Sequence, residues 1–213
     1  MEDYCVLLNT DSLWPKEITC CSKLWYQGNI KLLSQPGVSI VGTRNPDQTG
    51  IARTLECTDI LGPKYTIISG LALGVDSIAH TEALNKGFST IAVIGTPIDK
   101  CYPKEHEKLQ QLIAQKGLVI SMFEPGTKVE KYFFMKRNLL MSQISKASVV
   151  TQADIHGGAM GQAGYTLKQG KKVYTFDFEN HMALKESVLV SSAKTIILDC
   201  PEQKLSAVQP ELF

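Results

Sequence analysis

Short apolar runs and longer amphipathic stretches alternate along most of this chain. The apolar runs are rich in Val and Ile, which is typical of strands buried on both faces of a parallel sheet. Strands are expected at 38–41, 66–69, 90–94, 118–122, 147–151, 172–176 and 195–198. Helices are expected between them at 49–61, 73–85, 103–115, 134–145, 160–169 and 183–192. This order predicts an α/β protein with a doubly wound, mainly parallel sheet and helices on both of its faces.

The two ends of the chain depart from this pattern. Residues 11–35 carry scattered apolar anchors, among them Trp14, Trp25 and Leu32, and are expected to form a short helical prelude. The tail at 201–213 has two prolines and mixed polarity, and is expected to be peripheral. The expected organisation is an N-terminal helical extension at 1–36, one α/β domain at 37–200 and a C-terminal tail at 201–213.

Charge and cysteine usage narrow the class of protein. The formal net charge is +1 over 213 residues, so any site for a polyanion has to be a local patch. There is no apolar run of about 18 residues and the N-terminus is acidic, so a soluble, cytoplasmic protein without a membrane segment is expected. The six cysteines form no CxxC pair, and His106-Glu107 does not complete HExxH. We therefore expect reduced thiols, no metal and no cofactor.

The strand at 38–41 ends in a loop suited to an anion. Gly42 permits a sharp turn, and Thr43 and Arg44 follow it before the helix expected at 49–61. Backbone N–H groups at a helix N-terminus attract phosphate, and a guanidinium binds it with two parallel hydrogen bonds. Arginine is scarce, with three in the chain against nineteen lysines. We predict that Gly42, Thr43 and Arg44 contact phosphate; the alternative is a solvated loop arginine.

Glycines follow two further strands at the same edge of the expected sheet. Ser69 and Gly70 come after the second strand, and Gly157 and Gly158 come after the fifth. Ligands of open α/β sheets bind outside the carboxyl ends of the strands, where glycine lets a phosphate approach the backbone. All four residues are predicted phosphate contacts. The alternative is turn chemistry, with Asp76 capping the next helix.

An aromatic and basic cluster stands at the start of a later expected helix. It combines a flat ring with two cations and an amide, and consists of Phe134, Lys136, Arg137 and Asn138. A ring stacks on any nucleobase while neighbouring cations hold the backbone, which is how many proteins bind single strands. Because Phe133 and Phe134 are adjacent, one is expected in the core and the other exposed. We predict that Phe134 is the stacking ring.

The order and spacing of these motifs resemble the DNA-processing protein A family (DprA, also called Smf). The match runs from about Trp14 to about Ile196 and includes VSIVGTR, SGLALGVDSIAHTEAL, STIAVIGTPIDKCYPKEHEKL, FFMKRNLL and TQADIHGGAMGQAGYTLKQGKKVYTF. The resemblance implies a Rossmann-like fold that binds and protects single-stranded DNA. It also implies delivery of the strand to a RecA-type recombinase during DNA uptake, recombination or repair, a homodimer, and no catalytic residues.

This chain departs from the family pattern at several strand ends. In place of the family's Ser-Glu, Glu-Ala, Ser-Gly and Thr it has Ser121-Met122, Gln152-Ala153, Gly157-Gly158 and Gln162. These differences indicate a diverged member. We also expect a short, single-domain version without the additional domains that many relatives carry.

A second function stays open from the sequence. The wider superfamily includes the lonely-guy phosphoribohydrolases, so a nucleotide sensor or hydrolase is an alternative use of the same cleft. Those enzymes carry a motif similar to PGGxGTxxE in the loop after the fifth strand, and the Glu of this motif is their catalytic residue. This chain has HGGAMGQAGY there, which aligns Tyr165 with that Glu and leaves Glu124 as the substitute carboxylate. Binding without turnover is the stronger form of this alternative, and an inactive scaffold is a third.

Overall fold

The computed structural model of the chain describes residues 4–154, 156–177, 187–196 and 198. Its strands are β1 (Cys5–Leu8), β2 (Lys23–Gly28), β3 (Gly37–Val41), β4 (Thr66–Ser69), β5 (Thr90–Val93), β6 (Leu118–Ser121), β7 (Ser148–Val150), β8 (Val173–Phe176) and β9 (Val188–Val190). They pair into one sheet in the order β1-β2-β6-β5-β4-β3-β7-β8-β9. The strands from β3 to β9 run parallel to one another, whereas β1 and β2 are antiparallel to their neighbours.

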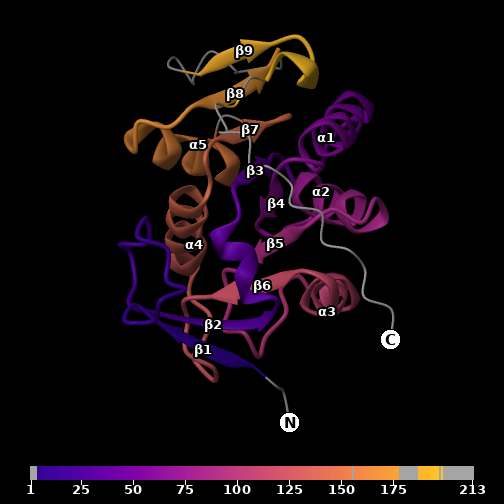
Figure 1. Cartoon of the computed structure of the whole chain (residues 1–213). Coiled ribbons are helices and arrows are strands. Elements are labelled where there is room, and N and C mark those ends of the chain that lie inside the picture. Colours follow the sequence, from indigo (N-terminus) through magenta and orange to yellow (C-terminus); the bar gives the residue numbers. More distant parts are fainter. Residues whose placement is uncertain (1–3, 155, 178–186, 197, 199–213) are drawn as a thin grey trace, which may run out of the picture.

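Helices cover both faces of this sheet. They are α1 (Gln48–Leu61), α2 (Val75–Asn85), α3 (Glu107–Lys116), α4 (Lys131–Ile144) and α5 (Gly158–Lys168). Figure 1 shows α1, α2 and α3 on one face and α4 and α5 on the other. The doubly wound, Rossmann-like α/β fold predicted from the sequence is therefore confirmed. No helix in the described ranges is long and apolar enough to cross a membrane.

The central strands form where the apolar runs predicted them. The six runs between residues 38 and 176 become β3 to β8, and the five helices follow within a few residues of their expected positions. Every residue of β3, β4, β5 and β6 is buried, which explains why these runs are uniformly apolar or small rather than alternating. The helix expected from residue 103 begins as a 3-10 turn, Lys104–His106, before α3.

The N-terminal segment is mainly a β-hairpin, which corrects the helical prelude expected at 11–35. β2 lies between β1 and β6, with Trp25 opposite Val6 on one side and Ser121 on the other. Leu24 faces the core, and the aromatic pair Trp25-Tyr26 favours a strand, so these apolar anchors are cross-strand partners. Within the described part of this segment, the helical piece is the 3-10 turn Ile30–Ser34.

The last described strand also differs from the expectation. β9 forms within the stretch expected to be a helix at 183–192, of which residues 183–186 lie outside the described residues. Ala193–Thr195 is a 3-10 helix, so the strand expected at 195–198 is wrong at its start, and residue 197 is not described. Ser192 Oγ accepts a hydrogen bond from Lys194 N at 3.2 Å, and this cap ends the extended backbone. The tail expected at 201–213 lies outside the described residues.

Candidate nucleic-acid interface

A cavity of about 430 Å³ opens at the carboxyl ends of β3 and β7, between α4 and the start of α5. Its volume lies in the range that small-molecule sites and single nucleotide pockets usually have. Arg44, predicted to contact phosphate, and Phe134, predicted to stack on a base, both line this cavity. Open α/β sheets bind ligands at this edge, so the position alone identifies it as the candidate site.

The loop after β3 forms one wall and holds Arg44 at the mouth of the cavity. Thr43 N donates to Gln152 O at 2.7 Å, and Thr43 Oγ1 donates to Asp154 Oδ2 at 2.9 Å. The Arg44 side chain is exposed, and no hydrogen bond or ion pair engages it within the described residues. Gly42 has a packing role, since a Cβ there would stand 2.5 Å from Val75 Cγ2. The backbone of this loop is thus held in place, while the Arg44 guanidinium is available to a ligand.

The N-terminus of α5 forms the opposite wall. The first N–H groups of a helix have no partner inside the helix, and the N-cap residue Gly157 has no side chain to satisfy them. Gly157, Gly158 and Ala159 all line the cavity. A Cβ on Gly158 would meet only Asn138 Nδ2, at 4.0 Å, so glycine here keeps the wall open. This helix end supplies an anion with backbone donors and a positive dipole.

Helix α4 presents one aromatic ring to the core and one to the cavity, as predicted. Phe133 is buried and stacks on Phe123, with ring centroids 3.8 Å apart. Phe134 is half-buried and lines the cavity. Its ring centroid lies 5.7 Å from that of Tyr102, whose side chain is 56% exposed. Tyr102 was not among the predicted site residues, so the sequence analysis missed this second exposed ring.

Arg137 is a buried clamp beneath the cavity. Its Nη1 donates to the carbonyl oxygens of Gly70 and Val93, the latter at 2.9 Å, and its Nε donates to Asn138 Oδ1 at 2.9 Å. Asn138 Nδ2 in turn donates to Gly158 O at 3.1 Å. The guanidinium, 7% exposed, therefore ties α4 to the ends of β4 and β5. It still lines the cavity, so its charge reaches a ligand although its Nε and Nη1 donors are committed to the fold.

Asp76 places a carboxylate near this clamp. Burial raises the pKa of Asp76, and the charge of Arg137 opposes that rise. Burial lowers the pKa of Arg137, Asp76 opposes this, and the charge of Arg44 adds to it. Asp76 Oδ2 also accepts a hydrogen bond from Ala72 N at 3.2 Å. The two guanidinium groups thus repel each other across the cavity, and a bound anion would relieve that repulsion.

Some predicted phosphate contacts lie away from the cavity. Ser69 is fully buried and its Oγ donates to Ile40 O at 2.7 Å, because the last residue of β4 points into the sheet. Gly70 is buried below the clamp and borders only a smaller neighbouring cavity. Lys136 is exposed, with Nζ 5.1 Å from the ring centroid of Tyr132. The cavity-lining stripe of α4 has helical spacing, which excludes position 136, and consists of Phe134, Arg137, Asn138 and Met141.

Five polar residues that line the cavity were not among the predicted contacts: Asn45, Asp76, Asp154, His156 and Gln162. Asp154 holds Thr43, His156 is exposed at the mouth, and Gln162 is buried one turn into α5. The available signal was the position of Gln162 four residues after Gly158, which places it on the same face of the helix. In the described ranges, no group of three His, Cys, Asp or Glu residues is placed to hold a metal ion.

His80 lies inside α2 and has a structural role. Its Nδ1 is 2.7 Å from Thr90 Oγ1, which fixes α2 to β5. Burial lowers the pKa of His80 from its ordinary 6.5 to about 3. The imidazole is therefore neutral in the folded protein over the physiological range.

Mild acid is expected to destabilise the fold through His80. In the unfolded chain the imidazole takes up a proton near pH 6.5, whereas in the folded chain it does so only near pH 3. Its contribution to stability is thus complete above about pH 6.5 and is lost towards pH 3, by up to about 1.4 kcal/mol per pH unit. Chemical unfolding at about pH 7 and about pH 5 measures this, with His80→Asn as the control that lacks the titration. An equal loss of stability between the two pH values in the unmodified protein and in His80→Asn would contradict this role of His80.

The fold and the site together define a Rossmann-like α/β protein with a cationic, aromatic-walled cavity at the carboxyl edge of its sheet. The sequence matches the family described as DNA recombination-mediator protein A over residues 5–202. The chain therefore belongs to this family, and the resemblance found in its motifs is confirmed.

Named relatives agree with this assignment. The chain is 31% identical over 185 residues to the DNA processing protein DprA of Streptococcus pneumoniae, covering 83% of this chain and 66% of that protein. It is 37% identical over 158 residues to the protein Smf of Borreliella burgdorferi, covering 73% of this chain and 50% of that protein. The chain thus spans between half and two thirds of the length of these relatives.

Solved structures give the same picture. The X-ray structure of the Streptococcus pneumoniae DprA aligns with a TM-score of 0.84 at 29% identity, covering 91% of this chain and 73% of that one. The Helicobacter pylori DNA processing protein A, described for its single-stranded DNA binding mode, aligns with a TM-score of 0.78 at 29% identity, covering 90% and 92%. A molybdenum cofactor binding protein from Rippkaea orientalis shares the fold at 14% identity and a TM-score of 0.54, covering 75% and 91%.

Proposed function

We propose that this chain binds single-stranded DNA in the cavity between β3, β7, α4 and α5. The observation that carries the proposal is the meeting of Arg44, the open N-terminus of α5 and the Phe134 ring in one cavity. Phosphate oxygens would accept from the Arg44 guanidinium and from the backbone N–H groups of Gly158 and Ala159, the first two residues of α5. The predicted contact at Gly157 is limited by its own N–H, which donates to Asp154 O at 2.8 Å. Thr43 and Gly42 hold this loop in place.

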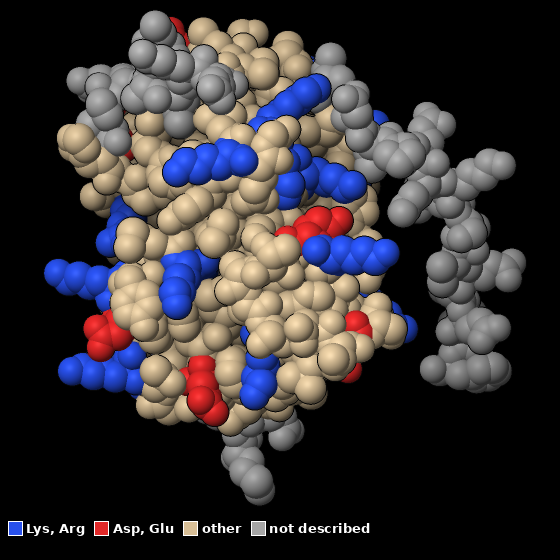
Figure 2. Space-filling view, turned by 90° about the vertical axis from the view of Figure 1, so that its left-hand side faces the viewer, with Lys and Arg blue, Asp and Glu red and all other residues tan. Residues whose placement is uncertain are grey.

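Base stacking supplies the second part of the proposed binding mode. Phe134 and Tyr102 form a pair of accessible rings beside the cations, and aromatic faces stack on any base. The surrounding surface favours a polyanion, because Figure 2 shows more lysine and arginine than aspartate and glutamate on the face that carries α4 and α5. Lys128, Lys131 and Lys136 are exposed around the start of α4, outside the cavity, and would add long-range attraction.

We further propose that the bound strand is protected and passed to a RecA-type recombinase during DNA uptake, recombination or repair. The family's description as a recombination mediator supports this step. The single-stranded DNA binding mode described for the Helicobacter pylori relative supports the ligand. We also propose a homodimer that joins two cavities, since a longer composite groove spans more of a strand. The proposed place of action is the cytoplasm.

The proposed role is binding without chemistry. The two carboxylates that line the cavity are engaged, Asp76 with Ala72 N and Asp154 with Thr43 Oγ1. Glu124 and Tyr165, the residues considered for a hydrolase, are not among the residues that line it. A nucleotide-binding sensor is the alternative that uses the same cavity, and the experiment below separates it from strand binding.

Labelled oligo-dT of several lengths, titrated at two salt concentrations, tests the proposal. Affinity is expected to rise with length and to fall with salt, with a log–log slope of about −0.7 for each phosphate contacted. A mononucleotide added as competitor is expected to leave the strand bound. Length-independent binding that a mononucleotide displaces would instead establish the sensor, and no binding of either would remove both.

A further inference from the structure

A buried amide lies at the inner end of the cavity. Gln162 is 1% exposed, yet it is among the residues that line the cavity. Its Nε2 donates to Ser39 Oγ at 3.1 Å and to Ser148 Oγ at 3.0 Å, with Thr166 Oγ1 at 3.4 Å. Its Oε1 is buried and has no hydrogen-bond partner among the described residues. A buried acceptor of this kind is unfavourable unless something donates to it.

A chain of hydroxyl groups fixes which end of the amide faces the cavity. Thr166 Oγ1 donates to Gln162 O at 3.2 Å, so its one proton is committed. Ser148 Oγ, 2.7 Å from Thr166 Oγ1, must then be the donor of that pair. Ser39 Oγ, 2.7 Å from Ser148 Oγ, must be the donor of the next pair by the same argument. All three hydroxyls have only lone pairs left for Gln162, so the amide has to turn its NH₂ group towards them.

The position of the hydroxyls directs the carbonyl group the other way. Ser39 and Ser148 are partners across β3 and β7, two residues before Val41 and Val150 at the carboxyl ends of these strands. The NH₂ group therefore points back into the sheet, and Oε1 points towards the carboxyl edge, where Val41 lines the cavity. Val41, Met141 and Ala159 make the remaining floor apolar. The floor thus suits a flat apolar group that carries one hydrogen-bond donor.

We propose that Gln162 Oε1 accepts a hydrogen bond from the N–H edge of a nucleobase that is splayed out of the bound strand into this cavity. The inference rests on the proposed function and adds to it a base pocket with Phe134 as wall and Gln162 as floor. Single-stranded bases are commonly held by stacking together with hydrogen bonds to their Watson–Crick edges. Each of the four bases has an N–H donor on that edge, so the pocket tolerates sequence while it requires a donor.

A thermodynamic cycle tests this hydrogen bond. The probes are oligo-dT of about 20 nucleotides, longer than the roughly 4–16 that one binding fold covers, and the same oligomer with 2,4-difluorotoluene in place of each thymine. Difluorotoluene keeps the shape of thymine and lacks its N–H donor. The proteins are the unmodified chain, Gln162→Met, and Gln169→Met as a matched change at the C-cap of the same helix, outside the cavity.

The unmodified chain and Gln169→Met are expected to bind the difluorotoluene strand about threefold to tenfold more weakly than oligo-dT, which corresponds to one hydrogen bond. Gln162→Met is expected to bind both strands within about twofold of each other, because the acceptor is gone. Differences in stacking between the two bases cancel in this comparison. Gln162→Leu replaces Gln162→Met if thermal unfolding shows that the methionine variant is not folded.

The outcomes separate this inference from the proposed function. Equal losses for the difluorotoluene strand in all three proteins would overturn it and leave strand binding intact, with an ordered water as the partner of Oε1. Failure of the unmodified chain to bind either strand would overturn the proposed function itself. A third strand, of N3-methylthymine, checks the result without any variant, since its methyl group replaces the donated proton and should weaken binding to the unmodified chain by at least threefold, roughly one hydrogen bond.

Discussion

Replacing Arg137 with Ala is expected to lower the free energy of unfolding by about 3–5 kcal/mol. The guanidinium is buried, and its loss leaves the carbonyl oxygens of Gly70 and Val93 without this charged donor. It also leaves the buried Asp76 without the positive charge that opposes its rise in pKa. Urea unfolding followed by circular dichroism measures the change in stability.

Two further variants show whether loss of the Arg137 clamp causes the drop in stability. Arg53→Ala removes an arginine that is half-buried on α1, with Cζ 5.1 Å from the Phe176 ring centroid, and should cost less than about 1 kcal/mol. Adding Asp76→Asn to Arg137→Ala should recover part of the loss, because the stranded carboxylate is then neutral. Similar losses for Arg53→Ala and Arg137→Ala would contradict the assignment of Arg137 as a clamp.

Replacing Arg44 with Ala is expected to weaken binding of oligo-dT by about tenfold or more, because a charge-assisted contact to phosphate is lost. The slope of affinity against salt should become shallower by about 0.7, the value for one phosphate of a single strand. Stability should change by less than about 0.5 kcal/mol, since the Arg44 side chain is exposed and makes no hydrogen bond or ion pair within the described residues. Fluorescence anisotropy at two salt concentrations gives the affinity and the slope.

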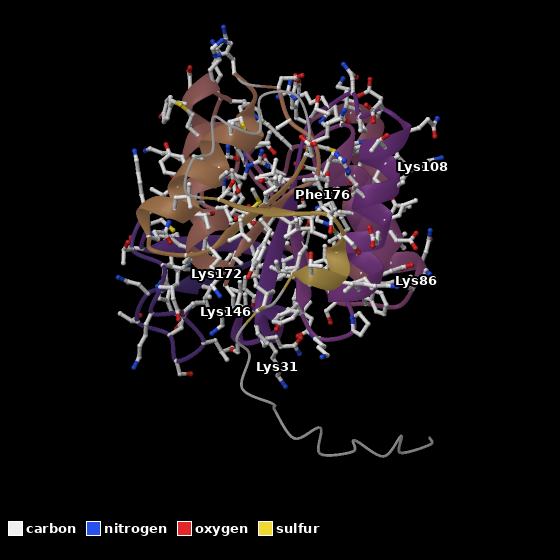
Figure 3. The ribbon with its side chains drawn as sticks, turned by 90° about the horizontal axis from the view of Figure 1, so that it is seen from above. Lys31, Lys86, Lys108, Lys146, Lys172 and Phe176 are labelled. Carbon is white, nitrogen blue, oxygen red and sulfur yellow. The ribbon has the colours of Figure 1, made fainter. Side chains whose placement is uncertain are left out.

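The control for Arg44 removes the same charge from the opposite edge of the sheet. Lys146 is exposed two residues before the start of β7, and Figure 3 labels it next to Lys172, whose carbonyl oxygen accepts from Ser148 N at 3.1 Å. Lys146→Ala should leave affinity within about twofold, because a distant exposed charge is screened. If both variants weakened binding equally, the effect would come from net charge, and the assigned site would be wrong.

The sequence predicted those parts of the fold in which the local residue pattern is compatible with one type of element. Val38, Ile40 and Val41 are β-branched and uniformly apolar, so a buried parallel strand was the one element they suited. Gly42 marked the turn at its end. Trp25 and Tyr26 favour a strand by residue type, but two residues show no periodicity, so the element is decided by its pairing with β1 and β6.

The candidate site was predictable to the level of the loops that build it. Arg44, Phe134 and Gly158 all line the cavity, since the carboxyl ends of parallel strands meet at one edge. The direction of each side chain was not predictable. Ser69 and Arg137 both have the chemistry to bind phosphate, but burial turns the first into the sheet and commits Nη1 of the second to carbonyl oxygens. Those side-chain directions depend on tertiary packing, which the local patterns of a single sequence do not reveal.

The strand order of the sheet has a consequence for how the protein is made. β3 lies between β4 and β7, and Ser39 is 109 residues before its partner Ser148. At the usual pace of translation the ribosome needs on the order of ten seconds to cover that distance. During this time the central strand has one open side, and the walls of the cavity are not yet joined. A nascent chain that stalls before β7 emerges would therefore leave a half-built sheet in need of chaperones, with nothing able to hold DNA.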